Sequence, residues 1–205
     1  EIVMMAKRSG ADLIVMATQG RTGLAHLLMG SVTEAVLRTV SVPVLALRPW
    51  QAERHLTTVR RVLWATDFSP ASEGAWPYAI MLATLFAAEV VLLHVVRPAD
   101  MAGIADAPVP PPAHWLERYL EPLEHELERR QQEVEAQGLR ARRKVLVGAP
   151  AEVIVEEAGK EQADLIVTGT HGRTGLAHVL VGSVAEAVVR KAPCPVLAVR
   201  VRREG

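Results

Sequence analysis

Short apolar runs alternate with longer amphipathic segments along residues 58–202. The runs are rich in valine, isoleucine and leucine, which favours strands buried on both faces of a sheet. They cover residues 60–67, 89–96, 141–148, 163–169 and 194–201. Between them, the spacing of apolar positions predicts helices over 70–88, 115–137, 149–161 and 182–191. The proline-rich residues 97–113 are expected to form an irregular loop.

Five strands that alternate with four helices predict an α/β fold with a doubly wound, five-stranded parallel sheet. In such sheets, ligands bind beyond the carboxyl ends of the strands. Asp67 directly follows the first run, and the loop 169–182 follows the fourth. We therefore expect both to lie at one binding edge.

One segment of the sequence occurs twice, because residues 11–48 align without gaps with residues 163–200. Roughly two thirds of the aligned positions are identical, which indicates two copies of one structural unit. The first copy has no counterpart of the first three strands, and its opening residues, EIVMMAKRSG, match the interior of a predicted helix. We therefore expect residues 1–50 to be the C-terminal fragment of a first domain that lacks its preceding part, and residues 58–202 to be a complete second domain.

Glycines at fixed positions mark the connection between the fourth strand and the last helix: Gly169, Gly172 and Gly182, the last followed by Ser183. Glycine lets a backbone approach a ligand closely, and a helix start offers free N–H groups and a positive dipole end to an anion. Asp67 can accept hydrogen bonds from a ribose hydroxyl or a base amino group. The common phosphate-binding motifs G-x4-G-K-[ST] and G-x-G-x-x-G are absent from this sequence. Two plainer readings stay open: the glycines serve a turn only, and Asp67 braces the turn that follows it.

The same loop carries a family resemblance. Its pattern G-x2-G-x9-G-S is similar to the signature of ATP-binding universal stress proteins, as are the stretches VLWATDFSPASEGAW, VVLLHV and PCPVLAVR. The resemblance implies an adenine nucleotide alpha hydrolase-like fold with strand order 3-2-1-4-5 and dimerisation through the fifth strand, with tandem copies forming an intrachain pseudo-dimer. Because an exposed apolar edge favours aggregation, we expect the two fifth strands, Val44–Leu47 and Val196–Val199, to pair in antiparallel fashion.

The resemblance also implies which residues bind the nucleotide. Ala65, Thr66 and Asp67 would line the adenine and ribose side, and Val95 would pack on the base. The ribose and phosphates would be lined by Gly169, Gly172, Gly182, Ser183, Val184 and Ala185. One departure is the pair Trp64-Ala65, where many members carry a proline. The first copy has Ala17 in place of the first glycine and no partner aspartate, so it is not expected to hold a nucleotide alone.

Composition narrows the range of functions. Among 205 residues, 23 are basic and 23 acidic, a balance that favours neither a nucleic-acid nor a membrane partner. The single cysteine, Cys194, fits a reducing compartment and a space-filling role. The apolar stretch 79–96 is interrupted by Glu89 and His94, so a buried helix and strand are expected there instead of a membrane span. With no signal peptide visible, we expect a cytoplasmic protein.

Three hypotheses for function follow. The first is a non-catalytic regulatory protein that binds ATP, with ADP or AMP as alternatives and with or without Mg²⁺, and whose occupancy tunes dimer or partner contacts. The second is a dimeric interaction scaffold of the same fold that needs no nucleotide, and the third is a slow ATPase or self-phosphorylating enzyme. His171 and His178 lack a surrounding acidic or cysteine cluster, so no metal site is predicted. His94 is interpreted as a satisfied core or near-pocket histidine.

Overall fold

The structure is a computed structural model that describes residues 1–18, 29–48, 51, 58–105, 114–170 and 182–200. Strands and helices follow one another in the order α1 (Ile2–Ser9), β1 (Ile14–Ala17), α2 (Ser31–Thr39), β2 (Val44–Leu47), β3 (Arg61–Thr66), α4 (Pro70–Phe86), β4 (Glu89–Val96), α5 (Pro98–Ala105), α6 (Trp115–Glu135), β5 (Ala141–Val147), α7 (Pro150–Lys160), β6 (Leu165–Gly169), α8 (Ser183–Lys191) and β7 (Val196–Val199).

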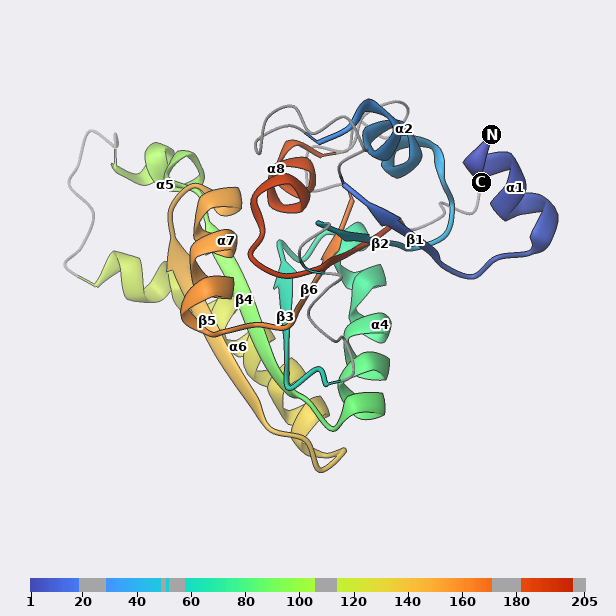
Figure 1. The fold of residues 1–205 in the computed structure, drawn as a ribbon. Helices are drawn as coiled ribbons and strands as arrows, with labels where there is room; N and C mark the ends of the chain where they lie inside the picture. Colours follow the sequence, from blue (N-terminus) through green and yellow to red (C-terminus); the bar gives the residue numbers. More distant parts are fainter. Residues whose placement is uncertain (19–28, 49–50, 52–57, 106–113, 171–181, 201–205) are drawn as a thin grey trace.

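Within these residues, seven strands form one sheet in the order β1-β2-β7-β6-β3-β4-β5 (Figure 1). All neighbours are parallel except β2 and β7, which are antiparallel with Leu45 opposite Leu197. The predicted antiparallel pairing of the two fifth strands is thus confirmed. The predicted five-stranded, all-parallel sheet is wrong, because this pairing joins the first copy to the edge that β7 would otherwise expose. The order 3-2-1-4-5 holds only among β3 to β7 and does not describe the whole sheet.

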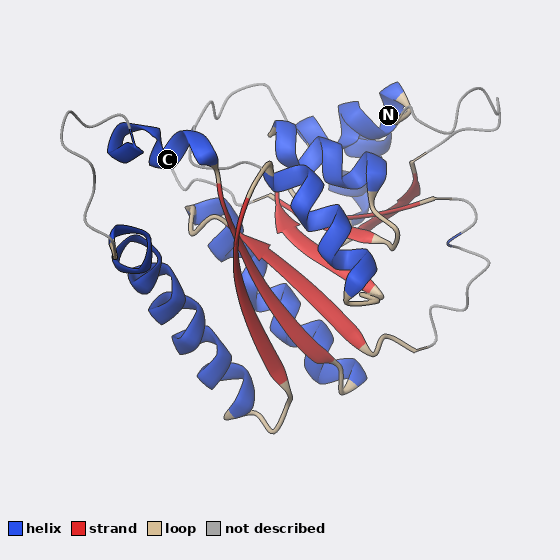
Figure 2. Ribbon diagram, turned by 90° about the vertical axis from the view of Figure 1, so that its left-hand side faces the viewer, coloured by secondary structure: helices blue, strands red, loops and turns tan. Residues whose placement is uncertain are grey.

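Helices cover both faces of the sheet (Figure 2). On one face, α2, α7 and α8 bury apolar side chains against the strands, and Leu37, Ile154 and Val188 belong to one continuous cluster there. On the other face, α4 and α6 pack over β3, β4, β6 and β7. Trp64 is fully buried on this second face, where its ring lies 4.5 Å from that of Trp76 of α4. The sheet is therefore doubly wound, as the alternation of strands and helices predicts.

Reciprocal arginine contacts accompany the β2–β7 junction. Arg48 donates to the carbonyl of Arg190 at the end of α8, and Arg200 donates to the carbonyl of Arg38 at the end of α2. Arg48 and Arg200 are equivalent positions of the repeat, as are Arg38 and Arg190. Such an exchange of identical contacts is the pattern of a two-fold interface, and each arginine places a cation at the negative end of a helix dipole.

The two copies differ in how far the side chains of their matching strands are covered. Val167 and Leu165 of β6 are 0% and 6% exposed, whereas the equivalent Val15 and Leu13 at β1 are 58% and 44% exposed. Strand β6 pairs with β3 and is covered by α4, but no described strand lies beyond β1. Strand β1 of the first copy is therefore an edge strand of the described sheet, and the apolar side chains of Leu13 and Val15 are exposed there.

The segment after β4 differs from its predicted irregular loop. Residues 98–105 form the helix α5, with Pro98 in its first turn, where a missing N–H is harmless. The backbone N–H of Asp100 donates to the carbonyl of Arg97, and the Arg97 side chain holds the Asp100 carboxylate with two hydrogen bonds. This local pairing stabilises the turn despite the prolines that follow. Residues 106–113 lie outside the described part of the chain.

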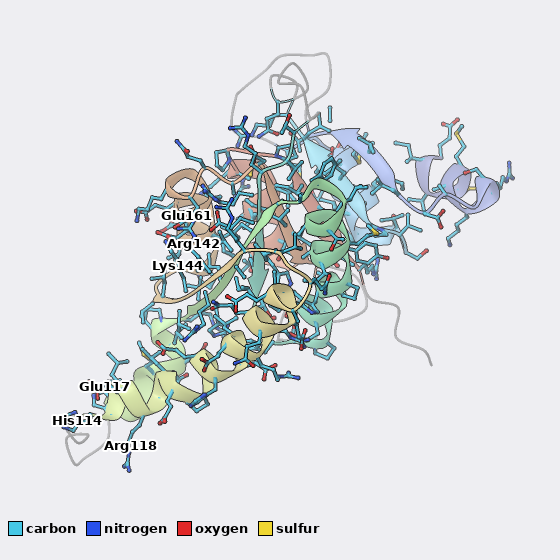
Figure 3. All side chains as sticks on the ribbon, turned by 90° about the horizontal axis from the view of Figure 1, so that it is seen from below. His114, Glu117, Arg118, Arg142, Lys144 and Glu161 are labelled. Carbon is cyan, nitrogen blue, oxygen red and sulfur yellow. The ribbon has the colours of Figure 1, made fainter. Side chains whose placement is uncertain are left out.

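A charged network joins the edge strand β5 to the end of α7 (Figure 3). Lys144 of β5 bonds the Glu157 carboxylate at 2.7 Å and also pairs with Glu161, which is bonded by Arg142 at 2.8 Å. The hydrogen bond from Lys144 holds the pKa of both Glu157 and Glu161 below its ordinary value. The same two carboxylates raise the pKa of Lys144.

The sign of these pKa shifts sets a pH dependence. A carboxyl group with a lowered pKa stabilises the fold above its ordinary value of 4.5, and this contribution is lost as the pH falls through the folded pKa. Lys144, with a raised pKa, contributes below 10.5 and loses its contribution only as the pH rises through its higher folded value. The network therefore stabilises the protein across neutral pH and fails first in acid.

We expect Lys144→Met to lower the free energy of unfolding by about 1–2 kcal/mol at pH 7. At pH 3 or below the effect should shrink, because the protonating carboxyl groups no longer attract the lysine. Urea denaturation at both pH values measures the difference. Lys160→Met is the control, since that lysine is 58% exposed and should contribute less. An equal loss for Lys144→Met at both pH values would contradict this account.

Candidate functional site

A cavity of about 180 Å³ lies where the carboxyl ends of β3, β4 and β6 meet the first turns of α7 and α8. Nine of the ten predicted site residues line it together: Ala65, Thr66, Asp67, Val95, Gly169, Gly182, Ser183, Val184 and Ala185. The tenth, Gly172, lies outside the described residues, as do His171 and His178. The structure thus brings the described candidates to one place, while their contact with a ligand stays a prediction.

The turn that carries Asp67 is closely hydrogen bonded. The Oδ1 atom of Asp67 accepts a hydrogen bond from the backbone N–H of Ser69 at 3.0 Å, and Thr66 Oγ1 accepts one from the N–H of Phe68 at 2.9 Å. Ser69 in turn caps α4, with its hydroxyl accepting from the N–H of Ser72. Asp67 therefore braces the turn and also lines the cavity, while its contact with a ligand stays a prediction.

The start of α8 lines the cavity as expected of the loop, with one correction to which amide groups are available. The N–H of Gly182 is not free, since it donates to the carbonyl of Thr170 at 2.7 Å and closes the turn before the helix. No side chain of the described residues caps this helix, and Ser183, Val184 and Ala185 of its first turn line the cavity. The amide groups and positive dipole end that suit an anion therefore begin at Ser183. Gly30 of the first copy makes the same closure to Thr18 at 2.9 Å.

Gly169 is needed for packing, and this role was not predicted. A Cβ at this position would lie 2.6 Å from the carbonyl carbon and oxygen of Ala71 and 2.8 Å from the amide nitrogen of Ser72. The backbone of α4 thus approaches β6 too closely for any side chain. Gly169 therefore serves the close approach of a helix, and its predicted approach to a ligand stays a prediction. The equivalent Ala17 lies in β1, beside which no described helix corresponds to α4.

Trp64, of the departing pair Trp64-Ala65, is not among the residues that line the cavity. Successive residues of a strand point to opposite faces, so Ala65 lines the cavity while Trp64 points into the helical layer behind it. There its Nε1 atom donates to the carbonyl of Ser72 at 3.3 Å.

Several cavity residues were missed by sequence reasoning: Ser72, Leu93, Arg97, Asp100, Pro150, Ile154, Thr168 and Thr170. His94, interpreted from the sequence as a core or near-pocket histidine, also lines the cavity. Arg97 and Thr170 each directly follow a strand, so extending the strand-end rule from Asp67 to every parallel strand would have found both. Arg97 bonds Asp100 through Nε at 3.0 Å and Nη2 at 2.6 Å. Asp100 raises the pKa of Arg97, and Asp67 adds to this rise, so the Asp67 carboxylate lies in the field of a cation.

Other reactive groups do not add chemistry to the cavity. Cys194 is buried away from it, and burial raises the pKa of its thiol to about 12, which keeps the thiol protonated and unreactive at neutral pH. Among the described residues, no three histidine, cysteine or acidic side chains come together as metal ligands would. The described helices include none that is both long and apolar enough to cross a membrane.

Comparison with known proteins agrees with this architecture. The model of the universal stress protein family matches residues 1–48 and 58–200. A universal stress protein of Methanocaldococcus jannaschii, MJ0531, is 39% identical over 144 residues, which cover 69% of this chain and 82% of that protein. A longer relative from Mycolicibacterium smegmatis is 33% identical over 94% of this chain, which spans 63% of that protein. The chain therefore belongs to the universal stress protein family.

Two solved structures extend the comparison. That of MJ0577 from M. jannaschii has a TM-score of 0.64 at 32% identity and covers 72% of this chain and all of its own. A universal stress protein in complex with cAMP has a TM-score of 0.52 at 26% identity, over 70% of this chain and 98% of its own.

The crowding at Gly169 leads to a test of its packing role. We expect Gly169→Ala to lower the free energy of unfolding by about 1–3 kcal/mol, because the added methyl group meets backbone atoms that cannot rotate away. Gly159→Ala in α7 is the matched control, since its Cβ would meet no atom within 4 Å. The control should stabilise the helix by up to about 1 kcal/mol. Urea denaturation measures both, and a Gly169→Ala variant as stable as the wild type would refute the close approach.

Proposed function

We propose that this protein is a regulatory module that binds an adenine nucleotide in the cavity at the carboxyl ends of β3, β4 and β6. ATP is the preferred ligand in this proposal, with ADP or AMP as alternatives and with or without Mg²⁺. The observation that carries the proposal is the first turn of α8, which no described side chain caps and which lines the same cavity as Asp67. One end of this cavity suits an anion and the other suits hydroxyl or amino donors.

The remaining walls fit the same ligand class. Leu93, Val95 and Ile154 provide apolar surface for a flat base, next to the small side chain of Ala65. At about 180 Å³ the cavity is smaller than the roughly 300–1,000 Å³ of pockets that bury a whole drug-sized ligand. The described walls therefore account for part of a nucleotide's surface, and Gly172, outside the described residues, is proposed to line the ribose and phosphates as well. The related protein in complex with cAMP supports the choice of an adenine nucleotide.

We propose binding without efficient turnover. The titratable side chains among the described cavity residues hold the cavity wall: Asp67 accepts from Ser69, Arg97 pairs with Asp100, and His94 lies 2.9 Å from the Thr66 carbonyl. Groups engaged in this way position a ligand better than they transfer protons. Any hydrolysis or self-phosphorylation is therefore expected to be slow.

The assembly proposed for this function follows the repeat. Residues 58–202 act as the complete nucleotide-binding domain, and residues 1–50 act as part of a first domain joined to it through β2 and β7. Nucleotide occupancy would tune this pseudo-dimer or contacts with other copies. We propose a cytoplasmic location, consistent with the single buried Cys194, and neither nucleic acid nor membrane as a partner.

A scaffold that needs no nucleotide is the second candidate. It is favoured by the structural tasks of Gly169 and Gly182, which pack against α4 and close the turn before α8 whether or not a ligand is present. The two candidates differ in whether adenine nucleotides bind at all.

Isothermal titration with ATP tests the proposal. We expect Asp67→Ala to weaken binding by about tenfold or more, and Ser183→Ala by about fivefold, because each removes a hydrogen-bonding group from the cavity. The equivalent change in the first copy, Ser31→Ala, is the matched control and should leave the affinity unchanged. No heat of binding in the wild type would favour the scaffold. Phosphate release or labelled protein above the level of Ser183→Ala would favour an enzyme.

A further inference from the structure

A buried histidine stands in the cavity wall directly beside the turn that carries Asp67. His94 of β4 is 3% exposed and lies opposite Thr66 in the parallel register of β3 and β4. Both residues line the cavity. A histidine at this depth needs polar partners, and its partners identify what it does.

Two contacts of His94 fall on the residues that flank Asp67. The Nδ1 atom lies 2.9 Å from the carbonyl oxygen of Thr66, the residue before Asp67. A carbonyl oxygen only accepts hydrogen bonds, so Nδ1 carries the proton and donates it. The imidazole ring also stacks on Phe68, the residue after Asp67, with ring centroids 4.6 Å apart and an angle of 22° between the planes.

The turn held in this way is conformationally demanding. Phe68 has a φ of 58°, a left-handed value that is unfavourable for a bulky side chain and persists only where surrounding contacts enforce it. The backbone N–H of Phe68 is bound by Thr66 Oγ1, which in turn lies 3.0 Å from Ser72 Oγ. His94 supplies both a hydrogen bond and a stacking surface to this arrangement from the neighbouring strand.

We propose that His94 is a positioning residue, which holds Thr66 and Phe68 so that the Asp67 carboxylate between them is presented to the nucleotide. The inference rests on the proposed function, and it adds the residue that fixes the position of the Asp67 carboxylate in the cavity. His94 acts through Asp67 in this account, although it also lines the cavity. A direct contact between His94 and the ligand is the competing explanation, and the experiment separates the two.

Two substitutions divide the contributions of the side chain. His94→Phe keeps a ring that can stack on Phe68 but removes the donor to Thr66, whereas His94→Asn keeps an N–H near the position of Nδ1 and removes the ring. We expect His94→Phe to weaken ATP binding by about tenfold and His94→Asn to stay within about threefold of the wild type. A merely structural role would instead make affinity follow the melting temperature in both variants.

A double-mutant cycle with Asp67→Ala tests the route of the effect. If His94 acts through Asp67, His94→Phe causes no further loss of ATP affinity once the carboxylate is gone. Additive losses would mean that His94 contacts the nucleotide itself and would overturn the proposal. So would a His94→Phe variant with the affinity of the wild type.

Amide hydrogen exchange in the nucleotide-free protein provides a readout that does not need ligand binding. The N–H of Ser69 donates to Asp67 Oδ1, so its exchange reports on the position of the carboxylate. We expect this exchange to be about tenfold faster in His94→Phe and close to the wild-type rate in His94→Asn. Unchanged exchange in His94→Phe would overturn the positioning role. Failure of the wild type to bind ATP, with faster exchange in the variant, would overturn the proposed function and leave the role of His94 in the turn supported.

Discussion

The register in which β3 pairs with both of its neighbours is the constraint on which the cavity depends. Ala65 lies opposite Leu93 of β4 on one side and opposite Thr168 of β6 on the other, so the carboxyl ends of all three strands lie at one edge of the sheet, with β4 continuing two residues beyond the end of β3. Because side chains alternate between faces, a slip of one residue would turn Ala65 away and bring the bulk of Trp64 into the cavity. The packing of the buried Trp64 against α4 resists such a slip, so hydrophobic packing on one face of the sheet maintains the shape of the cavity on the other face.

Close packing of α4 against β6 gives some residues of the glycine-containing loop a structural role in the fold. The first turn of α4 approaches Gly169 at the very end of β6, and the turn before α8 is closed by the N–H of Gly182. Residues of a ligand-binding signature can thus be required by the fold before any ligand is present. Ser183 and Asp67 differ from these glycines because they line the cavity and carry polar side chains.

Much of the architecture was predictable from the sequence because its signals are local. Apolar runs located β3, β4 and β6, and Ser69-Pro70 located the start of α4. The position of Asp67 and Ser183 in one cavity followed from the rule that parallel strands end together. Helix α5 was missed because the contact between Arg97 and Asp100 outweighs the proline-rich composition of the segment. The packing of Gly169 depends on a helix about a hundred residues earlier in the chain, a contact that no local pattern reveals.

The two ends of the sheet have opposite chemical character. At one end, β5 presents Arg142 and Lys144 bound to carboxylates, and charged side chains discourage a further strand. At the other end, β1 is short and carries the exposed Val15 beside Leu13, which leave apolar surface for another backbone. If this sheet were extended by a further strand, the edge at β1 would favour the addition more than the edge at β5, and β1 lies three strands away from β6 and the cavity in the order of the sheet.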